Sequence, residues 1–189
     1  QHSCRALQNT LRDENEETRE KLIDIILDEV GPYMKEVATD VYGQYLIPCM
    51  AQYVTPEQEE RLVNYLVENV IDIALTQHGC HCLQGTIEHF TPQSMEVLGS
   101  KLEDHFFQLC TTKTSKYLLN RILDKRVANE CDFVYKAVNK QIYEIATNSE
   151  GCAVINRCID HGDHDQMREL VEALRPYVTE LVKYPHTGY

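Results

Sequence analysis

The sequence lacks the features of membrane-spanning, secreted and disulfide-stapled proteins. None of its hydrophobic runs approaches the roughly 18 uncharged residues of a membrane span, and Gln1-His2-Ser3 does not begin a charged-then-apolar secretory signal. Its 8 cysteines among 189 residues are too sparse for a small disulfide-rich scaffold. We therefore expect a cytoplasmic chain with reduced thiols and no membrane association.

Motifs of catalysis and of metal binding are missing as well. The chain has no Gly-rich phosphate loop, no nucleophile elbow and no paired acid and base at a recognisable spacing. Its densest group of metal-ligating residue types, residues 78–82, lacks the CxxC spacing of a structural zinc site. We expect neither an enzyme nor a metal or cofactor site.

Basic residues are scarce, because 18 Lys and Arg stand against 30 Asp and Glu, a net charge of −12. Binding to phosphates depends on Lys and Arg, so this balance argues against generic polyanion binding over the whole surface. The hydrophobic share of 43% is ordinary for a folded domain.

A repeat of about 36 residues runs through the chain. Small residues recur at separations of 36 or 40, at Ser3, Gly43, Gly79, Ser115, Gly151 and Thr187. Apolar columns keep the same phase, including Leu11, Ala51, Ile87, Leu123 and Ile159, the pair Ala6-Leu7, and the large-then-small pairs Val37-Ala38, Ile73-Ala74, Leu109-Cys110, Ile145-Ala146 and Leu181-Val182. A fixed period of this length indicates stacked units that bury a common core.

Helix-start signals divide each period into two predicted helices. Thr55-Pro56 and Thr91-Pro92 each place an N-cap threonine before a proline, which is typical of a helix start. A second start follows each of the capping residues Asp40, Thr76, Thr112 and Asn148. The sequence therefore predicts an all-α fold, an α-solenoid of paired helices.

We expect one repeat domain over residues 1–189, truncated at both ends. The predicted complete repeats are 14–54, 55–90, 91–126 and 127–162, with partial repeats at 1–13 and 163–189.

Polar residues follow each small residue at a fixed i, i+1, i+4 spacing. The instances are Cys4-Arg5-x-x-Gln8, Gln44-Tyr45-x-x-Pro48, Cys80-His81-x-x-Gln84, Lys116-Tyr117-x-x-Asn120, Cys152-Ala153-x-x-Asn156 and an incomplete one at Gly188-Tyr189. On a helix, residues i and i+4 lie one above the other and can grip a planar edge. Residue i+1 projects sideways, where a ring or guanidinium can slip between stacked planes.

This pattern resembles the Pumilio (PUF) repeat family, RNA-binding α-solenoids in which each 36-residue repeat reads one base. The resemblance covers essentially the whole chain and implies a right-handed superhelix that binds single-stranded mRNA on its concave face, with the strand antiparallel to the protein. It implies that Cys4-Arg5-x-x-Gln8 reads adenine and that Cys80-His81-x-x-Gln84 reads adenine or uracil. It assigns no base to the triplets at Lys116 and Cys152, and Pro48 removes a reading side chain.

Charge is distributed unevenly within the repeat. The windows 3–9, 43–49, 79–85, 115–121 and 151–157 contain no Asp or Glu but hold the basic residues Arg5, Lys116, Arg121 and Arg157. We expect Arg121 and Arg157 to meet phosphates. Acidic residues crowd the first helix of each period, the expected convex face, where regulatory proteins could dock.

The resemblance thus implies a monomeric regulator of mRNA stability or translation. The predicted RNA-binding residues are Cys4, Arg5, Gln8, Gln44, Tyr45, Cys80, His81, Gln84, Lys116, Tyr117, Asn120, Arg121, Cys152, Asn156, Arg157 and Tyr189. The competing interpretation is a protein-interaction solenoid, similar to armadillo or HEAT proteins, whose inner residues no longer read bases. A relative active in ribosome biogenesis is disfavoured by the acidic charge.

Overall fold

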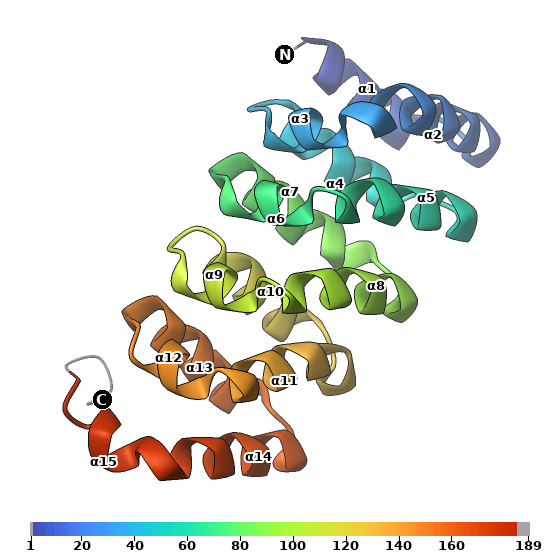
Figure 1. Cartoon of the computed structure of the whole chain (residues 1–189). Helices are drawn as coiled ribbons and strands as arrows, with labels where there is room; N and C mark the ends of the chain where they lie inside the picture. Colours follow the sequence, from blue (N-terminus) through green and yellow to red (C-terminus); the bar gives the residue numbers. More distant parts are fainter. Residues whose placement is uncertain (1, 185–189) are drawn as a thin grey trace. The chain divides into compact units, whose positions relative to one another are not determined.

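The computed structural model describes residues 2–184, apart from the side chains of His2, Ala128 and Asn129, and every regular element in that range is helical (Figure 1). The α-helices are α1 (His2–Asp13), α2 (Glu16–Val30), α3 (Met34–Thr39), α4 (Leu46–Ala51), α5 (Pro56–Val67), α6 (Val70–Leu75), α7 (Gln77–Thr86), α8 (Pro92–Glu103), α9 (Phe106–Thr111), α10 (Lys116–Lys125), α11 (Asp132–Lys140), α12 (Ile142–Ala146), α13 (Ser149–His161), α14 (His164–Leu174) and α15 (Val178–Leu181). Short 3-10 helices are η1 (Gly31–Tyr33), η2 (Gly43–Tyr45), η3 (Ile87–His89), η4 (Ala128–Cys131) and η5 (Arg175–Tyr177). The predicted all-α fold is confirmed, and within the described range no helix is both long and apolar enough to cross a membrane.

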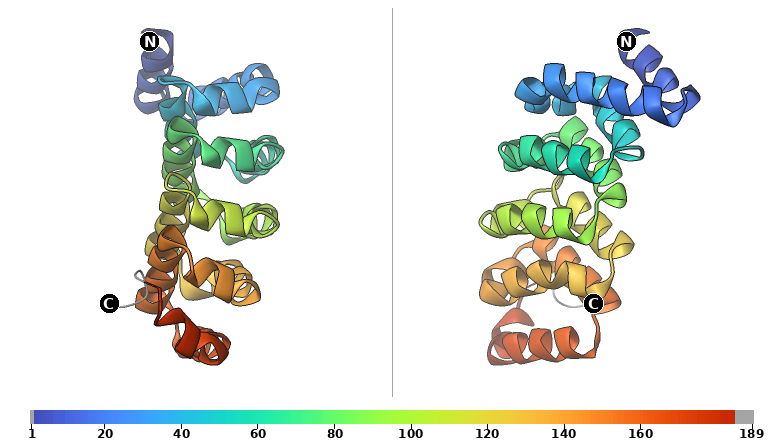
Figure 2. Two further views of the ribbon diagram at one scale, coloured as in Figure 1. Left: turned by 60° about the vertical axis from the view of Figure 1, so that its left-hand side comes forward. Right: turned by 90° about the vertical axis from the view of Figure 1, so that its right-hand side faces the viewer.

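The chain forms two compact units, residues 1–101 and 102–189. In the first unit, α4 contacts both α1 and α7, α2 packs on α5, and α3 packs on α6 and α7 (Figure 2). In the second unit, α10 packs on α13, α11 on α14, and α9 on α12 and α13. Each unit is therefore built of layers in which corresponding helices of successive periods lie side by side.

Each complete period holds three helical segments instead of the two predicted from the sequence. The first helix is interrupted at residues spaced 36 apart, with φ between −107° and −131° and ψ between −4° and 34°, at Tyr33, Asn69, His105, Gln141 and Tyr177. These values lie near the bridge region, outside a regular helix. The apolar periodicity does not show the break, because residues on both sides of it face the same core.

Most of the polar caps that the sequence predicts are found at the start of a helix. Thr55 forms a capping box with Gln58 at the start of α5, and Thr76 and Asn148 accept from amides in the first turns of α7 and α13. Thr112 differs, because its hydroxyl donates to a carbonyl of α9 and α10 begins only at residue 116. The prediction of a Thr112 cap is therefore wrong.

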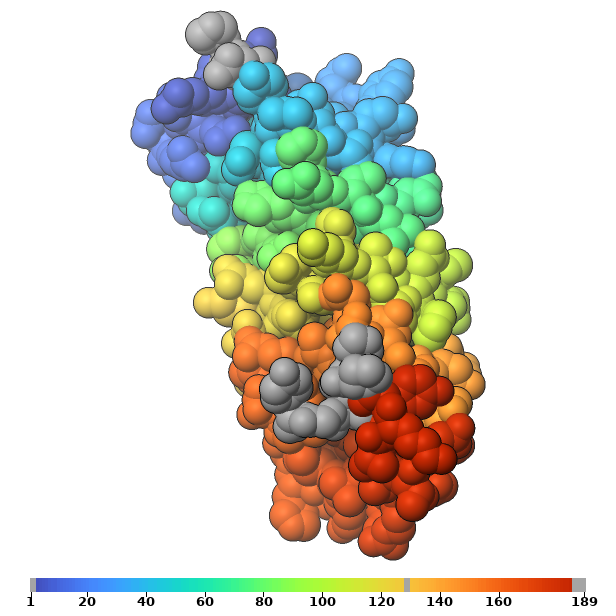
Figure 3. All heavy atoms as spheres, turned by 90° about the vertical axis from the view of Figure 1, so that its left-hand side faces the viewer, coloured from blue at the N-terminus to red at the C-terminus, as the bar shows by residue number. Residues whose placement is uncertain are grey.

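The small-residue column lies where the third segment of a period meets the second. A Cβ on Gly43, Gly79 or Gly151 would fall 2.2–2.3 Å from the carbonyl oxygen six residues earlier. Ser115 retains a side chain there, and its buried Oγ donates to the corresponding Leu109 carbonyl at 2.7 Å. These contacts hold α3 on η2, α6 on α7 and α12 on α13. Figure 3 shows α6 and α7, in green, packed against α3 in the first unit.

The predicted core columns are largely buried, with three exceptions. Four members of one column are at most 3% exposed, namely Leu11, Ala51, Ile87 and Leu123. Ile159 of the same column is 43% exposed and Val182 is 66% exposed, and Ala6 is exposed as well. These three predictions of burial are wrong.

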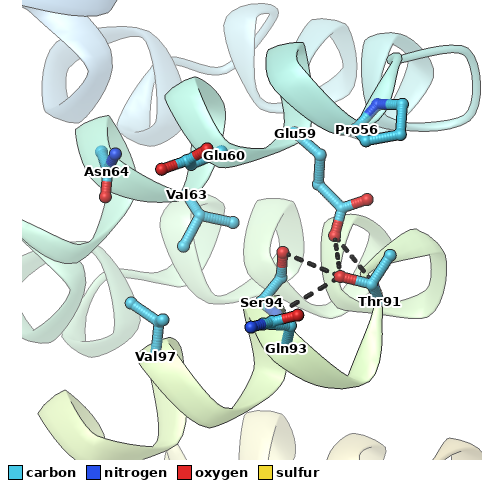
Figure 4. Close-up of a pocket in the computed structure, with 9 residues that line it drawn as sticks. All are labelled: Pro56, Glu59, Glu60, Val63, Asn64, Thr91, Gln93, Ser94 and Val97. Carbon is cyan, nitrogen blue, oxygen red and sulfur yellow. Dashed lines mark hydrogen bonds between the residues drawn. The ribbon is translucent and has the colours of Figure 1, made fainter.

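A buried carboxylate joins successive first helices in the first unit. Glu59 of α5 is 6% exposed, and its Oε1 accepts from the amide and the hydroxyl of Thr91 at 2.7 and 2.8 Å (Figure 4). Thr91 Oγ1 in turn accepts from the Ser94 amide in the first turn of α8. An anion at this position stabilises a helix N-terminus, so Glu59 fixes the start of α8 relative to α5.

We expect Gly151→Val to lower the free energy of unfolding by roughly 1–3 kcal/mol, the usual cost of overpacking, because its Cβ would collide with the Ile145 carbonyl. Gly151→Ser should cost less, since Ser115 shows that a serine in this column can donate to that carbonyl. Denaturant unfolding followed by circular dichroism compares the two variants. Unchanged stability of the valine variant would contradict the close approach.

Candidate nucleic-acid interface

The five complete polar triplets fall on corresponding helical segments, in each complete period the third one. We call these segments, α1, α4 with η2, α7, α10 and α13, the reader helices. In the first unit, α1, α4 and α7 are neighbours, and in the second unit α10 and α13 are neighbours. Each unit therefore brings its own triplets together in one layer.

On α1, the triplet residues are accessible. Arg5 is exposed, while Cys4 and Gln8 are half-buried and lie one helical turn apart. Gln8 can therefore present its amide, and Arg5 its guanidinium, to a planar ligand.

In the second triplet, the first position is turned inward. Gln44 is 4% exposed, and its Nε2 donates to the Val41 carbonyl and lies within hydrogen-bond distance of His78 Nδ1, both at 2.9 Å. Pro48 offers no polar side chain at the fourth-residue position. Only Tyr45, which is 50% exposed, remains available for a ligand in this triplet.

On α7, the two edge positions contact each other. Gln84 Nε2 lies 3.3 Å from Cys80 Sγ, and Cys80 is 2% exposed whereas Gln84 is half-buried. The exposed His81 ring meets the Tyr45 ring edge to face, with 5.4 Å between the ring centroids and 71° between the planes. A flat ligand that stacks on both rings requires one of them to turn.

On α10, the first position of the triplet forms an ion pair. Lys116 Nζ contacts the Glu150 carboxylate of α13 and lies 5.4 Å from the centre of the Tyr117 ring. Tyr117 is 51% exposed. Asn120 is half-buried, and its Oδ1 has no hydrogen-bond partner among the described residues.

On α13, two further polar groups are engaged within the chain. Cys152 Sγ lies 2.9 Å from the Ala146 carbonyl oxygen, and Arg157 pairs with Asp124 of α10. The His161 Nε2 atom lies 3.2 Å from the same Asp124 carboxylate. Asn156 at the fourth-residue position is exposed.

Acidic side chains therefore lie beside the reader-helix cations, although the sequence windows 115–121 and 151–157 contain no Asp or Glu. Glu150 directly precedes one window and Asp124 follows another by three residues, yet they lie against Lys116 and Arg157. Arg121, also predicted to meet phosphate, is half-buried. Tyr189 lies outside the described residues.

The cysteines outside the triplets are buried packing residues. All eight are free thiols, six of them buried, and the described residues contain no group of three or more His, Cys, Asp or Glu side chains that could hold a metal ion. Burial raises the pKa of the Cys82, Cys110 and Cys158 thiols to about 12. Thiolate formation is therefore disfavoured at these positions.

Comparison with protein families supports the assignment of the repeat. The model of the Pumilio-family RNA binding repeat matches residues 1–27, 33–67, 69–98 and 141–175, more than half of the chain. The stretch between residues 98 and 141, which carries α10, is not included in the match.

Two fungal proteins show how much of a longer relative the chain covers. It is 30% identical over 88 residues to Suppressor protein MPT5 of Saccharomyces cerevisiae, 47% of this chain and 10% of that protein. It is 27% identical over 88 residues to Pumilio domain-containing protein C6G9.14 of Schizosaccharomyces pombe, 47% of this chain and 12% of that protein. The chain thus spans about a tenth of the length of these relatives.

Solved structures match over the whole chain. The Puf4 RNA binding domain bound to the HO endonuclease RNA 3′ UTR recognition sequence has a TM-score of 0.88 and 30% identity, covering 100% of this chain and 58% of that one. The RNA-binding domain of yeast Puf5p bound to MFA2 RNA has a TM-score of 0.86 at 20% identity, covering 100% and 53%. At 20% identity the second likeness concerns the fold.

We expect the thiols to react in the order of their accessibility. Cys4 is partly exposed and should be alkylated by iodoacetamide at least about tenfold faster than Cys82, Cys110 and Cys158, whose thiolates are scarce. Peptide mass spectrometry of the native chain at mildly alkaline pH measures the rates, with the denatured chain as control. Equal rates in the native chain would contradict the described burial.

Proposed function

This chain belongs to the Pumilio family of RNA-binding repeat proteins, and we propose on that premise that it binds single-stranded RNA with the exposed side of its reader helices. The target class is the 3′ untranslated region of mRNA, as bound by the Puf4 domain. The chain spans 58% of that domain, so control of mRNA stability or translation is proposed for the longer protein, acting in the cytoplasm.

The observation that carries the proposal is the exposure of the i+1 residues. Tyr45 and Tyr117 are 50% and 51% exposed, and Arg5 and His81 are exposed as well. Large flat side chains at a helical repeat spacing are suited to stacking with unpaired bases, worth roughly 1–3 kcal/mol per base. A packing role would have buried these four side chains.

Base selection is proposed to be uneven along the chain. Cys4 and Gln8 can meet the edge of a base, and on α7 the half-buried Gln84 can do so beside the buried Cys80. The family resemblance favours adenine for the α1 triplet and adenine or uracil for the α7 triplet. Gln44 makes its hydrogen bonds inside the protein, so its repeat holds a base by stacking without selecting it. We therefore propose relaxed specificity, with the strand antiparallel to the chain.

The acidic first helices are proposed to face away from RNA. Glu16, Glu17, Glu57 and Glu60 are exposed on α2 and α5, which lie in a different layer from the reader helices of the first unit. Carboxylates repel phosphates, so these helices are available to basic regulatory proteins while the chain itself acts as a monomer.

Loss of stacking should abolish much of the affinity for RNA. Arg5→Ala combined with Tyr117→Ala is expected to weaken binding to a selected single-stranded RNA by roughly 1–3 kcal/mol for each lost stack. Fluorescence anisotropy over a salt series, against DNA of the same sequence, measures the effect.

The matched control for that double variant removes the same residue types elsewhere. Arg168→Ala combined with Tyr33→Ala changes an exposed arginine and an exposed tyrosine outside the reader helices and should leave binding unchanged. Equal affinity of both double variants would instead favour a protein-interaction scaffold, to be tested by charge reversal at Glu57 and Glu60.

Two glutamines, one at the first position of its triplet and one at the fourth-residue position, should behave differently. Gln84→Ala should erase the base preference at one position of RNA selected from a random pool, because its amide lies at the interface. Gln44→Ala should leave the selected sequence unchanged but reduce stability by roughly 1–3 kcal/mol, because it leaves buried groups unsatisfied. A changed base preference in the Gln44 variant would show that Gln44 turns outward to read RNA.

A further inference from the structure

The strongest polar contacts between the two reader helices of the second unit are ion pairs. Lys116 of α10 meets Glu150 of α13, and Arg157 of α13 meets Asp124 of α10. The two bonds run in opposite directions between neighbouring helices, which lie side by side in Figure 1. Both cations belong to the basic set that the sequence predicts for RNA contacts.

The Lys116–Glu150 pair is shielded from water more than the ion pairs of the first helices, whereas Arg157 is about as exposed as Arg61 at 37% in its pair with Asp24. The Lys116 and Glu150 side chains are 17% and 27% exposed, and those of Arg157 and Asp124 are 36% and 32% exposed. By contrast, Arg175 and Glu172 on the outer face of the same unit are 71% and 54% exposed. Reduced solvent screening strengthens a charge pair, so Lys116 is held more firmly than a typical surface cation, while Arg157 is held by Asp124, whose carboxylate also contacts His161.

A cation that is paired in this way contributes little to phosphate binding. RNA affinity gains from a lysine or arginine largely because a phosphate contact releases a condensed counterion. At Lys116 a phosphate must displace a protein carboxylate, which then remains beside it as an uncompensated negative charge. The same holds at Arg157, where His161 adds a third group to the cluster.

We infer that Glu150 and Asp124 are affinity-limiting residues of the RNA surface: they hold Lys116 and Arg157 and keep the second unit from binding phosphates strongly. The inference rests on the proposed RNA binding. The inference gives the two carboxylates a role in tuning affinity. It also makes the second unit the weaker contributor of electrostatic affinity, although that unit contains three of the four basic residues of the acid-free windows, Lys116, Arg121 and Arg157.

The test replaces each carboxylate by its neutral isostere in the whole chain. Glu150→Gln should bind a selected single-stranded RNA roughly three- to tenfold more tightly at low salt, and the dependence of log K on log salt should become steeper by about 0.7, the value for one further phosphate contact on a single strand. Asp124→Asn should act in the same direction, and the two changes together should add.

The matched control is Glu172→Gln, which removes one negative charge and one ion pair from the same unit outside the reader helices. It should leave affinity and salt slope unchanged. A second variant, Lys116→Gln in the Glu150→Gln background, should return both quantities to wild-type values, because the released cation is gone. Thermal unfolding of every variant verifies that the fold is retained.

Each outcome bears on a different statement. An unchanged or reduced affinity of Glu150→Gln, in a chain whose wild type binds RNA, overturns the inference, as does an equal gain in Glu172→Gln. Absence of RNA binding by the wild type overturns the proposed function itself. A gain that persists without Lys116 would show that Glu150 acts by direct repulsion of RNA and would overturn its role as the residue that holds the lysine.

Discussion

The close contact between a small residue and a backbone carbonyl is the constraint on which the repeat depends. At Gly43, Gly79 and Gly151 there is no room for a Cβ beside the carbonyl six residues earlier. Ser115 occupies the corresponding place, where its hydroxyl donates to that carbonyl. The contact brings the second and third segments of each period together, so the third segment is held against the layer beneath it and presents its opposite side to solvent.

The exposure of the reader helices follows from this packing. Because the small residue and the apolar residues after it face inward, the second residue after the small one projects outward, and Arg5, Tyr45, His81 and Tyr117 share that exposure. The helix itself does not decide whether an edge residue is available. Gln44 makes its hydrogen bonds inside the protein while Gln84 stays half-buried, so a repeat can keep its stacking residue and lose its reading residue.

Electrostatics divide the chain in two ways. Acidic residues gather on the first helices, as the sequence suggests, and the reader helices carry the inner basic residues. Within the reader helices, however, the cations are not equivalent. Arg5 is exposed on α1, whereas Lys116 and Arg157 are neutralised by carboxylates from the neighbouring reader helix. The net negative charge of the chain therefore does not describe its reader helices, whose cations differ in how they are paired.

The sequence by itself determined the period, the all-α class, the capping residues apart from Thr112, and the identity of the exposed column, because each depends on residues spaced a fixed distance apart along the chain. Tertiary structure decided the rest. The inward turn of Gln44 toward His78 and the approach of Glu150 and Asp124 to inner cations each join residues that are distant in sequence. Periodicity reports which side of a helix is apolar, but hydrogen bonds and ion pairs between stacked repeats depend on their three-dimensional packing. The exposure of Ile159 likewise depends on that packing.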